Sequence, residues 1–157
     1  MTQTTDRPSP AATPPRPAST ATTAALLLRL VFGALFTAHG AQKIFEWTIA
    51  GTAQAFGQMG IPLAELTAPV VAALEFGGGI ALVLGLLTRP IAALLAVDML
   101  GALALVHLGA GLFVADGGYE LVLALAGGAA ALALTGGGRL SLDHLLFARR
   151  RTASPTA

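Results

Sequence analysis

The sequence predicts an all-α fold, an integral membrane four-helix bundle with both termini in the cytoplasm. Hydrophobic residues occupy 55% of its 157 positions and charged residues only 11%, a balance that is too apolar for an ordinary water-soluble domain. The apolar residues gather in four stretches, most of them close to the ~20 residues that a helix needs to cross the hydrocarbon core. These expected spans cover about residues 24–45, 68–87, 91–108 and 119–135.

The charged residues that flank the spans set the expected orientation. One side carries the arginines, at Arg7, Arg16, Arg89, Arg139, Arg149, Arg150 and Arg151. The other two connections are acidic, with Glu46, Glu65, Asp116 and Glu120, and Lys43 is the only cation near them. Because basic flanks of membrane helices stay in the cytoplasm, we expect a multi-pass protein of the cell (inner) membrane whose acidic loops lie outside.

Both ends of the chain are expected to lack structure. Residues 1–22 consist mainly of Thr, Pro, Ala and Ser, which bury too little surface to offset the entropy of ordering, so they predict a disordered cytoplasmic tail. Residues 148–157 predict a second disordered tail, which is basic. Residues 23–147 should form one transmembrane domain. Its first span is expected to be retained rather than cleaved as a signal peptide, because Arg29 interrupts its start.

The first external loop, residues 46–66, is long enough to hold an element of its own. Apolar side chains recur there at helical spacing, at Ile49, Ala53, Phe56 and Met59. This pattern predicts a short helix that lies in the outer interface. Thr67 followed by Pro69 is typical of an N-cap and a first helical turn, and predicts the start of the second span.

Glycine and proline mark the remaining boundaries. Thr88-Arg89-Pro90 predicts a tight cytoplasmic turn that joins the second and third spans as an antiparallel hairpin, and the glycines at 136–138 should end the fourth span. After them, residues 140–147 form an amphipathic stretch beside a basic cluster that can bind anionic headgroups. Small residues predict close approach of helix backbones, at Gly33, Gly40, Gly77, Gly78, Gly79, Gly85, Gly101, Gly127 and Gly128.

Ionisable residues inside the spans need partners, because an unpaired charge at the bilayer centre costs several kcal/mol. At ~1.5 Å per residue, Arg29 and Asp98 lie at similar depths, as do His39 and Glu75, so we expect two interhelical pairs. His107 lies nine residues beyond Asp98, on the opposite face of the third span. Those two side chains cannot reach one central site unless the helix distorts.

Several interpretations of this polar core remain open. It can fix helix register, line a site for a quinone headgroup or another small polar ligand, or conduct protons or ions. His39 and His107 could also hold a b-type haem. The chain has no cysteine, which excludes disulfides, iron–sulfur clusters and thiol redox chemistry of its own. No metal-ligand cluster or catalytic acid pair stands out, and no nucleic-acid partner is expected because the basic residues are scattered rather than gathered in one patch.

Four segments together resemble DoxX-type membrane proteins. They are Arg29…Gly33…His39-Gly40…Gln42-Lys43, Glu75-Phe76-Gly77-Gly78-Gly79-Ile80 running to Gly85-Leu86-Leu87-Thr88-Arg89, Gly117-Gly118-Tyr119-Glu120, and Thr135-Gly136-Gly137-Gly138-Arg139-Leu140-Ser141-Leu142-Asp143. The likeness covers about residues 24–147. It departs at Gly137, where similar proteins often have proline, which should loosen the turn without affecting chemistry.

The resemblance implies a four-helix inner-membrane protein and a redox association. The family takes its name from subunits of a thiosulfate:quinone oxidoreductase, and other members look like membrane partners of oxidative-stress enzymes. It therefore implies an accessory or quinone-interacting subunit that works with a redox enzyme, and it leaves a homo-oligomer open. A small transporter or a structural scaffold remains the alternative. The polar-core set carried over by the resemblance is Arg29, His39, Gln42, Lys43, Glu75, Asp98, His107 and Glu120.

Overall fold

The computed structural model describes residues 20–146. The expected tails and the basic cluster at 149–151 fall outside this range, apart from residues 20–22, which belong to the first helix. Residues 20–146 form helices joined by turns and short loops and contain no strand, which confirms the all-α class. Its elements are α1 (Thr20–Ala41), η1 (Gln42–Glu46), α2 (Thr48–Gln58), α3 (Ala64–Leu84), α4 (Thr88–Ala102), η2 (Leu103–His107), η3 (Leu108–Ala110), η4 (Val114–Asp116) and α5 (Glu120–Thr135).

Three helical stretches of the described chain are long and apolar enough to cross a membrane. They are Thr20–Glu46, Ala64–Leu84 and Thr88–Ala110, where the first and third continue α1 and α4 through their π-helical turns. The apolar helix α5 is shorter, at 16 residues, as its sequence predicts. The protein is therefore a multi-pass membrane protein.

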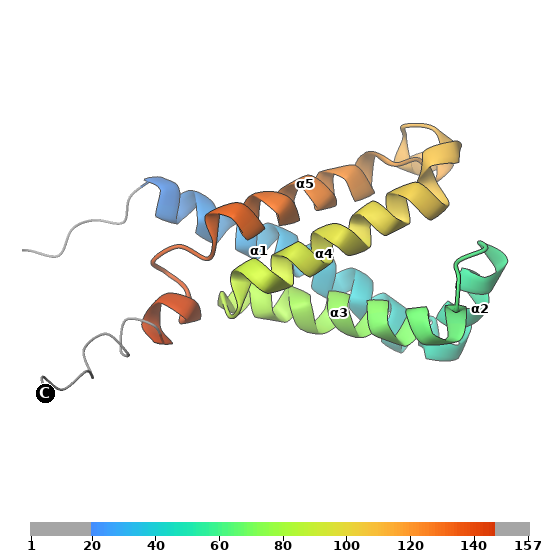
Figure 1. The fold of residues 1–157 in the computed structure, drawn as a ribbon, viewed down its shortest axis with the longest axis horizontal. Helices are drawn as coiled ribbons and strands as arrows, with labels where there is room; N and C mark the ends of the chain where they lie inside the picture. The colour runs from blue at the N-terminus through green and yellow to red at the C-terminus, as the bar shows by residue number, and fades with distance from the viewer. Residues whose placement is uncertain (1–19, 147–157) are drawn as a thin grey trace, which may run out of the picture.

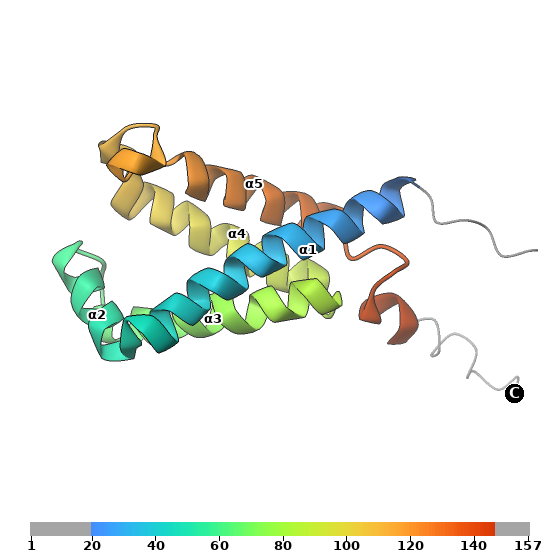
Figure 2. The same ribbon diagram turned by 180° about the vertical axis from the view of Figure 1, so that it is seen from behind.

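The helices form two antiparallel pairs, α1 with α3 and α4 with α5 (Figures 1 and 2). The pairs meet at the end that holds the start of α1 and residues 142–146. They diverge toward the opposite end, which carries α2 on one side and the connection between α4 and α5 on the other (Figure 1). We call these the closed end and the wide end.

Two helices begin earlier than expected. The expectation that Thr67 caps α3 is wrong, because α3 begins at Ala64. Leu63 adopts a left-handed conformation with φ 51°, and its carbonyl accepts hydrogen bonds from the amides of Leu66 and Thr67. Leu63 thus supplies the first helical acceptor one turn upstream. Likewise α4 begins at Thr88, so the turn before it is made by residues 85–87 rather than by Thr88-Arg89-Pro90.

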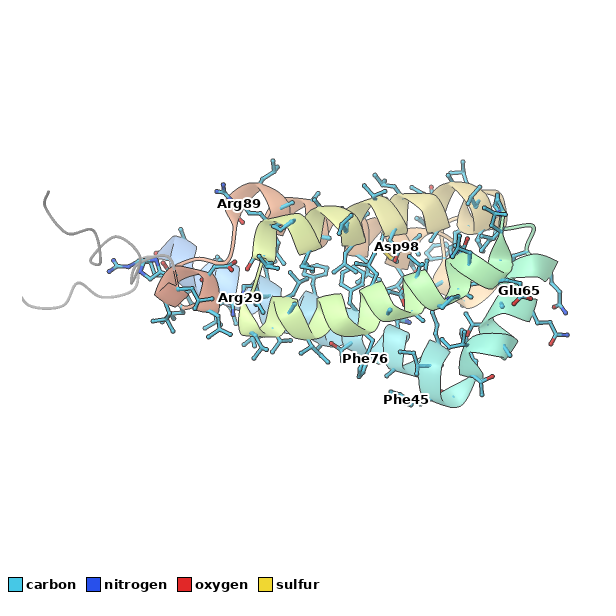
Figure 3. All side chains as sticks on the ribbon, turned by 60° about the horizontal axis from the view of Figure 1, so that its bottom comes forward. Arg29, Phe45, Glu65, Phe76, Arg89 and Asp98 are labelled. Carbon is cyan, nitrogen blue, oxygen red and sulfur yellow. The ribbon has the colours of Figure 1, made fainter. Side chains whose placement is uncertain are left out.

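The helix expected in the first external loop is α2, an 11-residue helix between α1 and α3. It ends at Gln58, and Gly60 follows with φ 76°. The Thr52 hydroxyl donates to the Lys43 carbonyl at 3.0 Å, which ties α2 to the π-helical turn η1. The rings of Phe45 and Phe76 pack edge to face with their centroids 5.6 Å apart, which fixes η1 against α3 (Figure 3).

Glycines allow α1 and α3 to pack closely, as expected. A Cβ atom on Gly40 would collide with the backbone of Phe76, and one on Gly79 would collide with the backbone of Thr37. Gly128 of α5 likewise leaves room for the ring of Phe32. The expectation does not extend to all small residues, because a Cβ atom would meet nothing within 4 Å on Gly77, Gly101 or Gly127.

Candidate functional site

A cavity of about 420 Å³ lies between the two helix pairs at the wide end. Six of the eight residues expected in the polar core line it: His39, Gln42, Lys43, Glu75, Asp98 and His107. The remaining wall is largely apolar and aromatic, with Phe36, Trp47, Phe56, Leu121 and Leu125 among its members. A concave apolar site with a few convergent polar groups is the usual form of a small-molecule site.

Two π-helical turns shape the polar side of this cavity. The turn η1 places Gln42 and Lys43 on the cavity wall, and the turn η2 places His107 there. Asp98 and His107 would face opposite ways on an undistorted helix, yet both line the cavity because η2 widens the helix between them. π-Helical turns are rare in proteins, and many of those that do occur lie at functional sites.

Lys43 and Glu75 form a buried ion pair in the cavity wall. The Lys43 ammonium nitrogen lies 2.6 Å from Glu75 Oε2, and the two side chains are 13% and 3% exposed. The expected pair of His39 with Glu75 is therefore wrong. Lys43 lies one turn beyond His39, and its long flexible side chain reaches back to the carboxylate. Removing either partner of such a pair would leave an uncompensated buried charge.

Asp98 is the residue of the cavity that has a buried polar atom without a hydrogen-bond partner in residues 20–146. Its Oδ2 atom is buried and has no hydrogen-bond partner in this part of the chain. Glu75 and Lys43 are the charged groups that interact with it electrostatically. A buried acceptor without a partner costs about 1–3 kcal/mol, so its presence calls for a specific reason.

The two histidines of the cavity differ in their surroundings. The Nδ1 atom of His107 lies 2.7 Å from the Gly117 carbonyl oxygen. Because a carbonyl only accepts, Nδ1 carries the hydrogen, and Nε2 of the neutral ring remains an acceptor. His39 lines both the cavity and a shallow groove on the outer face of η1, which also includes Phe45 and Glu46. No group of three or more acidic or histidine side chains within residues 20–146 is placed to hold a metal ion.

Arg29 lies outside the cavity, at the closed end, and its expected pair with Asp98 is wrong (Figure 3). Its side chain is 2% exposed and donates to four carbonyl oxygens, those of Leu82, Val83, Gly137 and Leu140, at 2.6–2.9 Å. The last carbonyls of a helix have no intrahelical partners, so the C-terminus of α3 attracts the guanidinium. Helix depth does not predict these partners, because they are backbone carbonyls rather than charged side chains.

The eighth expected residue, Glu120, also lies outside the cavity. It is the first residue of α5, and its Oε1 atom accepts a hydrogen bond from the Val114 amide at 2.7 Å. Glu120 therefore fixes the connection between α4 and α5 that borders the wide end.

Asp143 is an important residue that the sequence did not single out. Its carboxylate accepts hydrogen bonds from the amides of Leu87 and Thr88, at 2.7 and 2.8 Å, and so caps the N-terminus of α4. Its own amide donates to the Gly85 carbonyl at 2.9 Å. N-caps are normally sought just before a helix, whereas this one lies 55 residues away from the amide of Thr88. In the sequence Asp143 follows a glycine-rich stretch, and nothing near it marks it as the cap of a distant helix.

The most informative apolar residue missed at the sequence level is Trp47. It is the single tryptophan of the chain, it follows η1 directly, and it lines the cavity. Trp47 lies four residues after Lys43, a spacing that places two side chains on the same face of a helix.

Comparisons with known proteins agree with this architecture. The family model described as DoxX matches residues 24–108. The chain is 36% identical over 132 residues to the “Putative oxidoreductase CatD” of Bacillus subtilis, an alignment that covers 84% of this chain and 93% of that protein. It is 38% identical over 125 residues to the inner membrane protein YqjF of Escherichia coli, covering 77% and 90%.

A third relative is the uncharacterized membrane protein Rv3486 of Mycobacterium tuberculosis, 33% identical over 138 residues, with 82% of this chain and 83% of that protein covered. No solved structure matches the chain. The family model spans more than half of the sequence, and each of these relatives is matched over most of its length. The chain belongs to the DoxX family of membrane proteins.

Proposed function

We propose that the protein binds the headgroup of a quinone in the wide-end cavity and serves as an accessory membrane subunit of a redox system. In this proposal both termini are cytoplasmic and the cavity lies in the outer half of an inner membrane. The observation that carries it is the buried Oδ2 atom of Asp98, which has no partner within residues 20–146 and borders a cavity. A ligand with a polar atom at that position would supply the missing hydrogen bond.

The residues of the cavity suit a planar ring with an oxygen at each end. Aromatic side chains such as Phe36 and Phe56 can pack against such a ring. The Lys43 ammonium has three donors, of which one is directed to Glu75, so it can also donate to a ring oxygen. Asp98 and Nε2 of His107 can hold or accept a proton at another ring oxygen.

A bound quinone would supply two-electron redox chemistry that the chain's own side chains lack. The sequence has no cysteine for thiol redox chemistry, and in this proposal the electrons are exchanged with a partner enzyme. The protein's part would be to bind and orient the ring and to keep water from it. The name of the relative CatD, which includes the word oxidoreductase, supports a redox association of this kind.

Tryptophan fluorescence provides a direct test. Because Trp47 is the single tryptophan and lines the cavity, a bound quinone should quench its emission in a titration of the detergent-solubilised protein. Asp98→Leu keeps the branched shape of the side chain and removes both oxygens. We expect it to weaken binding by about tenfold or more, which corresponds to a lost hydrogen bond of ~1.4 kcal/mol.

The matched control is Asp116→Leu, because Asp116 is exposed and does not line the cavity. It should leave the affinity unchanged. Equal quinone affinity in the Asp98→Leu variant would contradict the proposal. So would a Soret band lost in a His39→Ala/His107→Ala variant, which would identify a haem, or solute flux in protein-only liposomes, which would identify a transporter. If cavity substitutions alter only the thermal stability, the protein is a scaffold.

A further inference from the structure

The mouth of the cavity is formed by exposed apolar side chains. Trp47 and Met59 border it on the α1–α3 side, and Leu105 and Val114 border it on the α4–α5 side. Their exposed fractions range from 46% to 55%. We call these four residues the rim. Large exposed apolar groups that border a cavity are typical of surfaces that contact lipid or an apolar ligand.

The apolar surface continues beyond the rim on both sides. Further exposed side chains at the wide end are Phe45, Leu63, Leu66, Leu108, Leu112 and Phe113. Several of them lie in connecting segments rather than in the spans. Connecting segments that face water normally carry polar residues. The mouth therefore lies inside an apolar layer at the end of the bundle.

The charged groups of the cavity, Glu75 with the Lys43 ammonium and Asp98, lie below this rim. Glu75 is 11 residues from the start of α3 at the wide end, which corresponds to roughly 17 Å along the helix axis. Asp98 is seven residues from the rim residue Leu105, or roughly 10 Å. The cavity thus has a charged floor and an apolar entrance, the reverse of what a water-soluble polar solute would meet on its way in.

We propose that the ligand is an amphiphile with a long hydrocarbon tail that enters from the bilayer. Its headgroup lies at Lys43 and Asp98, and its tail leaves the cavity across the rim, between Trp47 and Leu105. The assignment rests on the proposed function and adds that the cavity distinguishes tailed from tailless quinones. The continuity of the cavity with the rim, and the distance between floor and mouth, favour a tail over a docked protein.

The test compares a quinone that carries a decyl tail with the same headgroup without a tail, in protein reconstituted into lipid nanodiscs. The rim variant is Met59→Asn/Leu105→Asn, which keeps Trp47 as the fluorescent probe. We expect the ratio of the two affinities to fall on the order of tenfold, as for the loss of roughly 60 Å² of apolar contact, while tailless binding changes less than twofold. Partition of the tail into lipid is the same for both proteins and cancels.

The matched control is Leu63→Asn/Leu66→Asn, which alters two exposed leucines at the same end that do not line the cavity. It should leave the ratio unchanged. An unchanged ratio in the rim variant would overturn the inference and leave the rim as a surface for lipid or a partner protein, while the proposed quinone site stands. Equal losses for both quinones, or for both variants, would also overturn it. If wild-type protein binds neither quinone, the proposed function itself fails.

Discussion

Arg29 and Lys43 are both cations within the membrane-spanning helix that begins at Thr20, yet their charges are stabilised in different ways. Lys43 is paired with the carboxylate of Glu75, whereas Arg29 is surrounded by carbonyl oxygens. The planar guanidinium has five donors in a fixed geometry and can bind four carbonyls at once, more than the three donors of a lysine ammonium allow. The two residues also differ in role, because Arg29 joins segments at the closed end and Lys43 borders the cavity.

At this scale we predict that Arg29→Lys reduces stability and not binding. The ammonium has three donors and cannot reproduce four hydrogen bonds to carbonyls of two segments. Hydrogen bonds from charged groups contribute about 1.5–3 kcal/mol each, so the unfolding free energy should fall by about that amount or more. Thermal unfolding in mild detergent measures the loss, with the exposed residue Arg139 changed to lysine as control. Weaker quinone binding at unchanged stability would contradict this placement of Arg29.

The helix α3 ends through backbone geometry that requires a glycine. Gly85 has φ 70°, its amide donates to the Leu82 carbonyl, and the Leu86 amide donates to the Ala81 carbonyl, which together make a Schellman motif. A Cβ atom on Gly85 would also lie 2.5 Å from Arg29 Cζ. The end of α3, Arg29 and the Asp143 cap of α4 therefore form one hydrogen-bonded assembly at the closed end.

Helix packing gives a prediction at the scale of the elements. Gly40→Ala should destabilise the protein, because its Cβ atom would collide with the backbone of Phe76, which cannot move without separating α1 from α3. Overpacking of this kind costs about 1–3 kcal/mol. Gly77→Ala is the matched control, since a Cβ atom meets nothing there and alanine favours a helix by roughly 0.5–1 kcal/mol. Equal unfolding temperatures of the two variants would contradict the close approach.

The sequence predicts helices better than it predicts their ends and distortions. Hydrophobic length is a local property, so the spans and α2 could be read directly. The left-handed residue Leu63 gives no such signal, and neither do the π-helical turns η1 and η2, because each depends on tertiary contacts rather than on local propensity. Six residues of the expected polar core line the cavity, whereas the pairs expected from helix depth do not form, because pairing depends on the same tertiary contacts.

The cavity itself is a property of the whole molecule. It exists because two helix pairs meet at one end and diverge at the other, and no single segment encodes that divergence. The two pairs are built alike, since α1 and α4 each pass through a π-helical turn at the wide end before a connection leads to the next helix. The polar floor combines residues of three elements, with Lys43 from η1, Glu75 from α3 and Asp98 from α4.

The orientation of the bundle gives the prediction at this scale. The chain has no cysteine, so single substitutions provide unique labelling sites without further changes. Asp116→Cys, in the connection at the wide end, should react with a membrane-impermeant maleimide in intact spheroplasts. Arg139→Cys, at the closed end, should react only after the membrane is permeabilised, because arginine-rich flanks stay inside. The reverse pattern of labelling would place the termini outside.

The hydrogen bonds of Arg29 have a consequence for biosynthesis. Two of its acceptors, Gly137 and Leu140, are 108 and 111 residues further along the chain. At a translation rate of roughly 5–20 residues per second, the ribosome needs on the order of 5–20 s to reach them after Arg29 has been made. During that interval two of the acceptors that Arg29 binds in the folded protein do not yet exist. Insertion of the first helix therefore precedes assembly of the closed end, whose hydrogen bonds to Arg29 are complete only after the residues that follow α5 have been synthesised.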